Sequence, residues 1–407
     1  MTRLDLVELG DWTDVRLDPA TGQALAASQV VETRPTPYDA GLWQVRALAK
    51  VGVAKIASVE LRIAPKIPIR RLFFLLGYVR NPRGWREHPV EVGEESGLLP
   101  ALAYAFERQA DRAVRQGILQ GYRYTEDALP VIRGRLRYTD QLRDWQGLPV
   151  PLEVSYDEFT VDIPENQLLL AATERLLRLA GVAKDVRHRL LRLRLRFTDV
   201  SRLVRGRPLP TWRLTSLNER YETALGLAEI VLREASIEHA EGAVRVDGFL
   251  LNMAQVFEDF ITTALAESLS PHGGRCRFQA THHLDEDNRI RMKPDLVWYD
   301  ADRRPLAVAD AKYKAEKPAG FPDADLYQML AYCTALNLAH GHLVYAKGNE
   351  PQAQHTVRNA GVTILQHALD LNQAPSALLT NTARIANEML GLTEVITQLQ
   401  QQPLMET

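Results

Sequence analysis

The residues of this 407-residue chain whose types and spacing could support chemistry are concentrated between Asp295 and Lys312. Asp295 precedes the apolar run Leu-Val-Trp, and fifteen residues after Asp295 a second apolar run, Leu306-Ala-Val-Ala, ends at Asp310-Ala-Lys312. Because side chains alternate along a strand, Asp310 and Lys312 should lie on the same side, and a hairpin between the runs would bring Asp295 beside Asp310. Two adjacent carboxylates repel each other unless a divalent cation lies between them, and hard oxygen ligands suit Mg²⁺. The spacing therefore predicts a magnesium site formed by Asp295 and Asp310.

A magnesium ion in this place would favour hydrolysis of a phosphodiester. It would lower the pKa of a bound water molecule and offset the charge that builds up on the phosphorus centre. Lys312 could orient that water or stabilise the pentavalent phosphate. The alternative is an ordinary ion pair between Asp310 and Lys312 at a strand end, because Asp-x-Lys occurs by chance in many proteins.

A predicted helix over residues 252–268 supplies a third acid. Its apolar side chains form one stripe, and Glu258 lies on the flank of that stripe, whereas Asp259 points toward solvent. Glu258 is therefore predicted as a further metal ligand, directly or through water. The alternative for Glu258 is a salt bridge at the boundary of the core.

The elements around these residues predict a C-terminal mixed α/β domain over residues 246–407. Gln328 and Tyr332 are four residues apart in a predicted helix, 324–338, so they share one face and are predicted to support the site. His340-Gly-His342 is predicted to end this helix in a turn. Strands are predicted at residues 275–280, 290–299, 306–311, 342–346 and 362–365.

Residues 1–150 are predicted to form a β-rich domain that binds a partner. Short apolar or alternating runs at residues 42–45, 51–56 and 59–63 predict strands. The strongly apolar stretch at residues 72–76 predicts a buried helix, with a partner-binding face as the alternative.

Residues 151–245 are predicted to form a helical and basic middle region. Asp162 is the expected N-cap of a long helix that has Pro164 in its first turn. Nine arginines and a single acid, Asp199, lie between Arg187 and Arg213, a density that favours contact with a phosphate backbone. The alternative is a solvated helix face balanced by acids elsewhere. The predicted DNA-binding residues are Arg187, Arg189, Arg192, Arg194, Arg202, Arg205 and Arg207.

Composition and missing motifs exclude several classes of protein. The net charge of −2, from 49 basic and 51 acidic residues, gives no global attraction to nucleic acid. No Gly-Lys pair occurs, so no P-loop can form and nucleotide hydrolysis would belong to another chain. Residues 1–30 lack the apolar core of a signal peptide, and no apolar run reaches the roughly 18 residues of a membrane span. A cytoplasmic protein without a membrane partner is expected.

Two groups of motifs resemble known families. Glu258, Pro294-Asp295, Asp310-x-Lys312 and Gln328-x-x-x-Tyr332 resemble the PD-(D/E)xK nuclease superfamily in its RecB-like form. The upstream motifs resemble the McrC family, and this resemblance extends from about Tyr38 to about Lys347. These motifs are Val51-Gly-Val-Ala-Lys-Ile, Leu61-Arg-Ile-Ala-Pro-Lys-Ile with Phe73-Phe-Leu-Leu-Gly-Tyr, and Tyr156-Asp-Glu-Phe-Thr-Val-Asp-Ile-Pro-Glu-Asn.

The resemblance implies an α+β multidomain fold with a β-rich N-terminal domain, a helical middle region and a C-terminal PD-(D/E)xK nuclease domain. It also implies an Mg²⁺-dependent endonuclease subunit of a McrBC-type restriction system. The expected partners are a hexameric McrB-like AAA+ GTPase, which the subunit stimulates, and double-stranded DNA containing modified cytosine. The alternative is a non-catalytic adaptor that binds DNA and activates an AAA+ motor.

Overall fold

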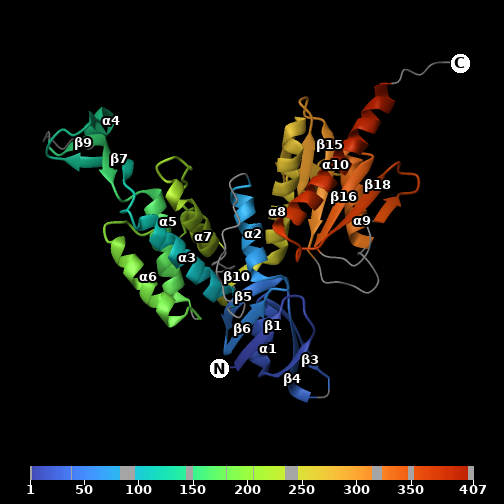
Figure 1. The fold of residues 1–407 in the computed structure, drawn as a ribbon, viewed down its shortest axis with the longest axis horizontal. Helices are drawn as coiled ribbons and strands as arrows, with labels where there is room; N and C mark the ends of the chain where they lie inside the picture. The colour runs from blue at the N-terminus through green and yellow to red at the C-terminus, as the bar shows by residue number, and fades with distance from the viewer. Residues whose placement is uncertain are drawn as a thin grey trace. The chain divides into compact units, whose positions relative to one another are not determined.

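The computed structural model describes residues 2–37, 39–82, 97–143, 150–179, 181–204, 206–233, 246–313, 323–346 and 353–401. These residues form a mixed α/β protein with several separate sheets. The chain divides into two compact units (Figure 1): the first unit combines residues 1–98 with residues 237–407, and the second unit comprises residues 99–236. The predicted N-terminal domain, residues 1–150, is thus divided between both units. None of the helices in the described ranges is long and apolar enough to cross a membrane.

The N-terminal part of the first unit contains two small sheets. Its elements are β1 (Thr2–Val7), β2 (Thr13–Arg16), α1 (Pro19–Ala27), β3 (Val31–Thr36), β4 (Asp39–Ala47), β5 (Lys50–Ile56) and β6 (Val59–Ala64). The three strands predicted from residue 42 to residue 63 are confirmed. One sheet has the order β2-β4-β3, and in the other β6 lies between β1 and β5. Val45, Ile56 and Leu61 are fully buried in the core that these elements share.

A strand from far along the chain completes the second of these sheets. β10 (Val246–Asn252) runs antiparallel to β5, and Leu250 lies opposite Gly52. Gly52 has a φ of +133°, and a Cβ atom there would lie 2.1 Å from the carbonyl oxygen of Phe249. Only glycine allows the two backbones to approach this closely. Residues 246–252, at the start of the predicted C-terminal domain, therefore belong to the N-terminal sheet.

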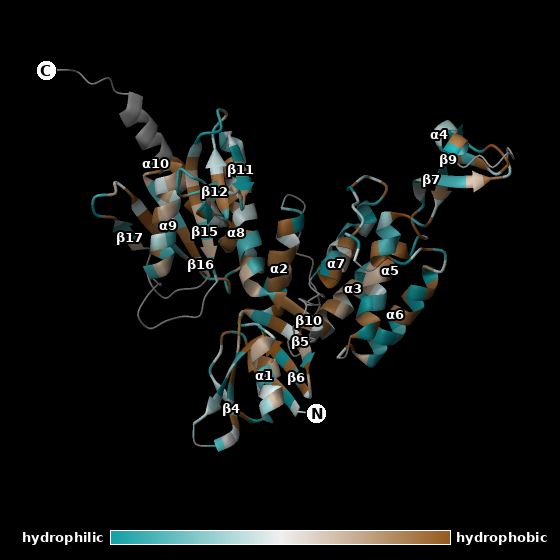
Figure 2. Cartoon of the chain, turned by 180° about the vertical axis from the view of Figure 1, so that it is seen from behind, coloured by the Kyte–Doolittle hydropathy of each residue, from teal (hydrophilic) through white to brown (hydrophobic). Residues whose placement is uncertain are grey.

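The strongly apolar stretch forms α2 (Ile69–Arg80), which confirms the predicted buried helix (Figure 2). Phe74 and Tyr78 of this helix pack edge-on against Phe260 of α8 (Met253–Leu269), with ring centroids 5.7 and 5.5 Å apart. The apolar face of α2 is therefore covered from within the chain.

A six-stranded sheet forms the C-terminal part of the first unit, with the order β11-β14-β15-β16-β18-β17. Its β14–β15 hairpin is antiparallel, and β15, β16 and β18 are parallel. Met329 and Cys333 of α9 pack on one face of the sheet, and Glu388 of α10 contacts His367 on the other face. The elements are the 3₁₀ turn η2 (Ser270–His272), β11 (Arg275–Phe278), β12 (His282–His283), β13 (Arg291–Met292), β14 (Leu296–Tyr299), β15 (Pro305–Lys312), α9 (Asp323–Leu336), β16 (His340–Ala346), β17 (Ala353–Thr356), β18 (Thr363–Leu369) and α10 (Pro375–Gln401).

Two sequence predictions in this sheet are wrong. The single strand expected at residues 290–299 is divided into β13 and β14, because Pro294 has no N–H group for a strand ladder. His340-Gly-His342 begins β16 rather than ending a helix in a turn. A Cβ atom on Gly341 would lie 2.5 Å from the sulfur of Met329, so this glycine serves close packing between α9 and the sheet.

The second unit consists of helices and a small three-stranded sheet. Its elements are α3 (Leu98–Val114), β7 (Gly121–Leu129), β8 (Arg135–Leu136), α4 (Tyr138–Arg143), β9 (Leu152–Thr160), α5 (Pro164–Arg178), α6 (Lys184–Arg196), the 3₁₀ turn η1 (Glu219–Tyr221) and α7 (Glu222–Arg233). The strand order is β7-β9-β8. In α6 the buried residues Val186, Leu190 and Leu193 form one stripe, and the remaining faces carry most of the arginines together with the exposed Leu191 and Leu195.

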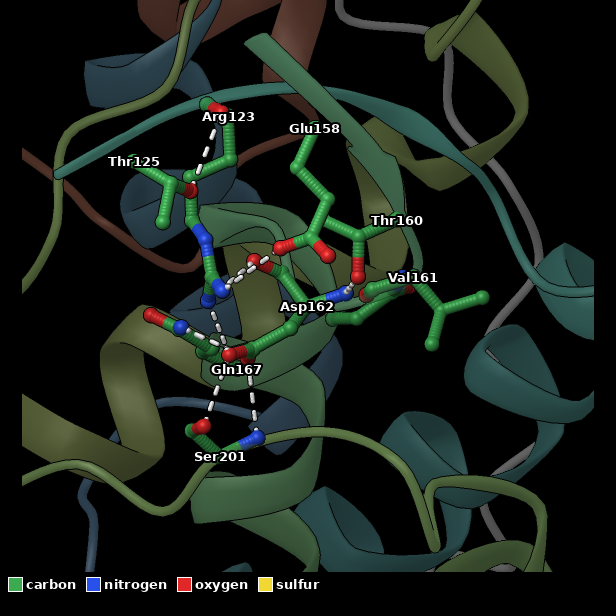
Figure 3. Close-up of polar contacts among 9 residues, drawn as sticks. Arg123, Thr125, Glu158, Thr160, Val161, Asp162, Gln167 and Ser201 are labelled. Atoms are coloured by element: carbon green, nitrogen blue, oxygen red, sulfur yellow. Dashed lines mark hydrogen bonds and ion pairs between the residues drawn. The ribbon is translucent and has the colours of Figure 1, made fainter. Parts of the chain in front are cut away.

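Asp162 does not cap α5, contrary to the prediction. The N-cap is Ile163, without a side-chain bond, although Pro164 does begin the helix. The buried carboxylate of Asp162 instead accepts bonds from Arg123 of β7, Gln167 of α5 and Ser201 after α6, and the backbone N of Ser201 lies 2.8 Å from Oδ1 (Figure 3). Asp162 does not cap the helix because these partners already donate hydrogen bonds to both of its carboxylate oxygens. The motif from Tyr156 to Asn166 therefore holds the small sheet on the helices.

Candidate active site

The β14–β15 hairpin brings Asp295 and Asp310 together, as the sequence predicted. Leu296, which follows Asp295, pairs with Ala309, which precedes Asp310. Oδ2 of Asp295 accepts a hydrogen bond of 2.8 Å from the backbone N of Ala311, which directs this carboxylate toward the end of β15. Asp310 is buried, with 2% of its surface exposed.

Lys312 lies on the same side as Asp310 and forms an ion pair with it. Its Nζ atom also donates to Oε1 of Gln328 at 2.8 Å, and Nε2 of Gln328 donates to the hydroxyl of Tyr332 at 2.8 Å. The Tyr332 hydroxyl in turn donates to the backbone oxygen of Lys293 at 3.4 Å. Gln328 and Tyr332 thus connect α9 with Lys312 and with the residues that precede Asp295.

Glu258 is half-buried on α8, while Asp259 is exposed, as the apolar stripe indicated. The side chain of Gln279 donates to Glu258, and the backbone N of Gln279 donates to the carbonyl oxygen of Asp295 at 3.1 Å. Gln279 therefore links two of the three acids. Its role could not be predicted from the sequence, since a single glutamine after a strand has no distinctive spacing.

Burial and neighbouring negative charge raise the pKa of both Asp295 and Glu258. Burial, followed by the negative charge of Asp310, raises the pKa of Asp295 to about 8. Burial also raises the pKa of Glu258, the hydrogen bond from Gln279 opposes this rise, and the charges of Asp259 and Asp310 add to it. Such mutual repulsion is relieved by a cation between the carboxylates.

The donor set fits a hard divalent cation. Oδ2 of Asp310 is buried and, among the described residues, accepts no hydrogen bond besides its ion pair with Lys312. Within the same residues no group of three or more His, Cys, Asp or Glu side chains is arranged to hold a metal ion. Mg²⁺ is commonly held by one or two carboxylates together with water and substrate phosphates, so Asp295 and Asp310 suit it.

Three of the seven predicted DNA-binding arginines are engaged within the second unit. Arg187 donates to two backbone carbonyls at the end of α5. The Nε atom of Arg189 lies 2.7 Å from Glu107, and the Nε atom of Arg202 lies 2.9 Å from Glu174. Acids elsewhere in this unit therefore balance the charges of Arg189 and Arg202, whereas backbone carbonyls hold Arg187.

The other predicted arginines have different surroundings. Arg192, Arg194 and Arg207 are exposed, and within the described part of the chain their side chains form no ion pair or hydrogen bond. Arg205 lies outside the described residues. The exposed arginines are the ones that remain suited to a phosphate backbone.

A surface that the sequence did not single out lies on the small sheet of the second unit. Tyr122 and Phe159 are 77% and 57% exposed, and they lie opposite each other on β7 and β9 with ring centroids 5.1 Å apart. We call this pair, with the exposed Tyr124 two residues further along the same face of β7, the hairpin surface. Local sequence patterns cannot show which faces of a sheet stay uncovered.

The fold and the site define a mixed α/β protein with a carboxylate and lysine cluster at one end of a sheet hairpin. Residues 45–346 match the McrBC 5-methylcytosine restriction system component family. The chain belongs to this family, which confirms the resemblance to McrC drawn from its motifs. No curated protein matches the chain.

Two solved structures from Thermococcus gammatolerans are similar to the chain. One is a chain of the refined half-complex from a tetradecameric assembly of McrB AAA+ hexamers with bound McrC. It matches with a TM-score of 0.57 and 20% identity, over 95% of this chain and 100% of that chain, which supports a shared fold. A chain of the cryo-EM structure of the McrBC complex matches with a TM-score of 0.38 and 20% identity, over 66% of this chain and 88% of that chain.

Proposed function

We propose that this protein is the Mg²⁺-dependent endonuclease subunit of a restriction complex directed at modified cytosine. The observation that carries the proposal is the cluster of Asp295, Asp310 and Lys312 at one end of the hairpin, with Glu258 and Gln328 beside it. The six-stranded sheet would then be a nuclease domain of the PD-(D/E)xK type.

Each residue of the cluster has a distinct task in this proposal. Asp295 and Asp310 would hold Mg²⁺, with Glu258 as a further ligand directly or through water. When bound, the ion supplies a water of lowered pKa and charge compensation at the phosphorus. Lys312 keeps a positive charge beside the scissile phosphate, where it orients the attacking water or stabilises the pentavalent phosphate. Gln328, which Tyr332 supports, holds Lys312 in that direction.

The substrate in this proposal is double-stranded DNA that contains modified cytosine. Arg192, Arg194 and Arg207 would contact its phosphates, which gives affinity without sequence preference. Recognition of the modified base is assigned to a partner, because phosphate contacts carry no information about the base.

The proposed partner is a hexameric McrB-like AAA+ GTPase, which this cytoplasmic subunit would stimulate. The similar Thermococcus structure contains McrB AAA+ hexamers with bound McrC. The hairpin surface is the candidate contact, since exposed apolar patches commonly mark protein interfaces. Tyr122 and Phe159 supply large rigid side chains of the kind enriched in such interfaces.

A cleavage assay tests the proposal. The protein is incubated with a McrB-like GTPase, GTP, Mg²⁺ and methylated plasmid, with unmethylated plasmid and a chelator as controls. We expect double-strand breaks only with the methylated plasmid and the metal. GTPase stimulation and DNA binding without breaks would instead support the non-catalytic adaptor.

A further inference from the structure

A contact between the N-terminal sheet and the end of β15 lies one residue from Lys312. The hydroxyl of Tyr313 donates to Oε1 of Glu8 at 2.8 Å. The same oxygen accepts a bond of 2.8 Å from the backbone N of Lys66. Glu8, which follows β1, is fully buried, and its Oε2 accepts no hydrogen bond among the described residues. A buried carboxylate without hydrogen-bond donors destabilises the fold. The Glu8 carboxylate therefore holds its two donors, the Tyr313 hydroxyl and the Lys66 N–H, in place.

Tyr313 also contacts the helix that carries Glu258. Its ring centroid lies 5.9 Å from that of Phe257, which directly precedes Glu258. Farther along α8, Phe260 is packed by the aromatic residues of α2. The N-terminal part of the first unit therefore contacts both elements that carry site residues, the end of β15 and the middle of α8.

Resting on the proposed function, we infer that Glu8 and Tyr313 are positioning residues that set Lys312 and Glu258 relative to the two aspartates. Tyr313 is adjacent in sequence to Lys312 and in space to the residue before Glu258. Loss of the Glu8 carboxylate would leave the Tyr313 hydroxyl and the Lys66 N–H without this acceptor, and their relaxation would move the end of β15. Reaction geometry tolerates little movement, because a displacement of about 1 Å can cost on the order of 10²-fold in rate.

The test uses full-length Tyr313→Phe and Glu8→Leu variants together with the GTPase partner. We expect kcat for cleavage to fall roughly 10–100-fold and the Mg²⁺ concentration for half-maximal rate to rise, as for other residues that orient ligands. KM for DNA and GTPase stimulation should be unchanged. Glu8→Gln keeps an oxygen that can accept both bonds and should restore most of kcat. The double variant should lose no more than Glu8→Leu alone, because the bond from Tyr313 is already absent from that variant.

Tyr221→Phe is the matched control, because it removes another buried tyrosine hydroxyl, which accepts a bond from Leu119 in the second unit. Wild-type kcat and Mg²⁺ dependence in Tyr313→Phe and Glu8→Leu would overturn the inference. Equal losses of cleavage, DNA binding and GTPase stimulation would also overturn it, since they indicate unfolding rather than positioning. An Asp310→Ala variant that still cleaves would instead refute the proposed function itself.

Discussion

Gln328 and Lys312 are joined by a hydrogen bond that fixes the direction of the lysine. Oε1 of Gln328 accepts from Nζ of Lys312, and Nε2 of the same amide donates to Tyr332, both at 2.8 Å. Because an amide has its acceptor and donors at different atoms, rotation by half a turn would turn its NH₂ group toward the ammonium of Lys312 and lose that hydrogen bond. The position of this positive charge therefore depends on α9 as well as on its own strand.

Asp310→Ala should abolish cleavage while leaving stimulation of the partner GTPase intact. The change removes a proposed metal ligand, whereas the proposed partner contact lies in the other unit. Nicking and GTP hydrolysis are measured in the same reactions. Asp302→Ala, an exposed acid in the turn of the same hairpin, is the matched control and should cleave normally. Retained cleavage by Asp310→Ala at saturating Mg²⁺ would contradict the assignment.

Lys312→Ala should bind Mg²⁺ nearly as well as the wild type but slow the chemical step. Loss of one preorganised electrostatic group typically costs on the order of 10²–10³ in rate. Gln328→Leu should reduce the cleavage rate less than Lys312→Ala does. The positive charge of Lys312 remains in this variant, and only the hydrogen bond that orients it is lost. Single-turnover cleavage and calorimetric Mg²⁺ binding separate the two effects. A larger loss in Gln328→Leu than in Lys312→Ala would show that the lysine is not the principal group.

The stability of the metal-free protein should depend on pH through Asp295. Its pKa is raised to about 8, so the folded state binds more protons than the unfolded state. Its contribution to the free energy of unfolding therefore falls as the pH rises from about 4 to about 8. Since Mg²⁺ needs the ionised carboxylate, its thermal stabilisation should be larger at about pH 8.5 than at about pH 6. Thermal melts of Asp295→Asn should lose this difference, and an unchanged profile would exclude Asp295 as its source.

Arg192→Gln combined with Arg194→Gln should weaken DNA binding without sequence preference. Each lost phosphate contact should reduce the slope of log affinity against log salt by about one. The control is Arg358→Gln, an exposed arginine outside the basic segment. An unchanged salt slope would show that the basic segment is a solvated helix face. Arg189→Gln should instead destabilise the fold, because it leaves the buried Glu107 without its partner.

Tyr122→Ser combined with Phe159→Ser should lower GTPase stimulation and partner binding, with little effect on folding. Both rings are exposed, so their main energetic role is expected in an interface. GTP turnover at increasing subunit concentration measures the effect. Val204→Ser is a control for loss of an exposed apolar side chain elsewhere in the second unit. Full stimulation by the double variant would place the partner contact on another surface.

The predicted domain boundary at residue 246 shows that a local sequence pattern cannot predict which sheet a strand joins. β10 lies at the start of the predicted C-terminal domain, but it pairs with β5 of the N-terminal sheet, and Gly52 allows the two strands to approach. A fragment that begins at residue 246 would contain β10 without the N-terminal sheet, of which β10 is an edge strand. Fragments for separate study are better cut after Asn252, where α8 begins.

The sequence by itself determined the features that depend on neighbouring residues. Alternation placed Asp310 and Lys312 on one side of a strand, and the apolar stripe of α8 distinguished Glu258 from Asp259. Spacing also placed Gln328 and Tyr332 on one helix face. These predictions succeeded because strand and helix periodicity fixes the direction of side chains locally.

Only the tertiary structure decided which distant groups meet. Glu8 and Tyr313 are 305 residues apart, and Arg189 and Glu107 are 82 residues apart, yet each pair shares a hydrogen bond. Asp162 has the sequence context of an N-cap but satisfies its oxygens elsewhere. Partners of this kind are selected by the packing of whole elements, which brings buried polar groups to the donors or acceptors they need, and no local pattern encodes that choice.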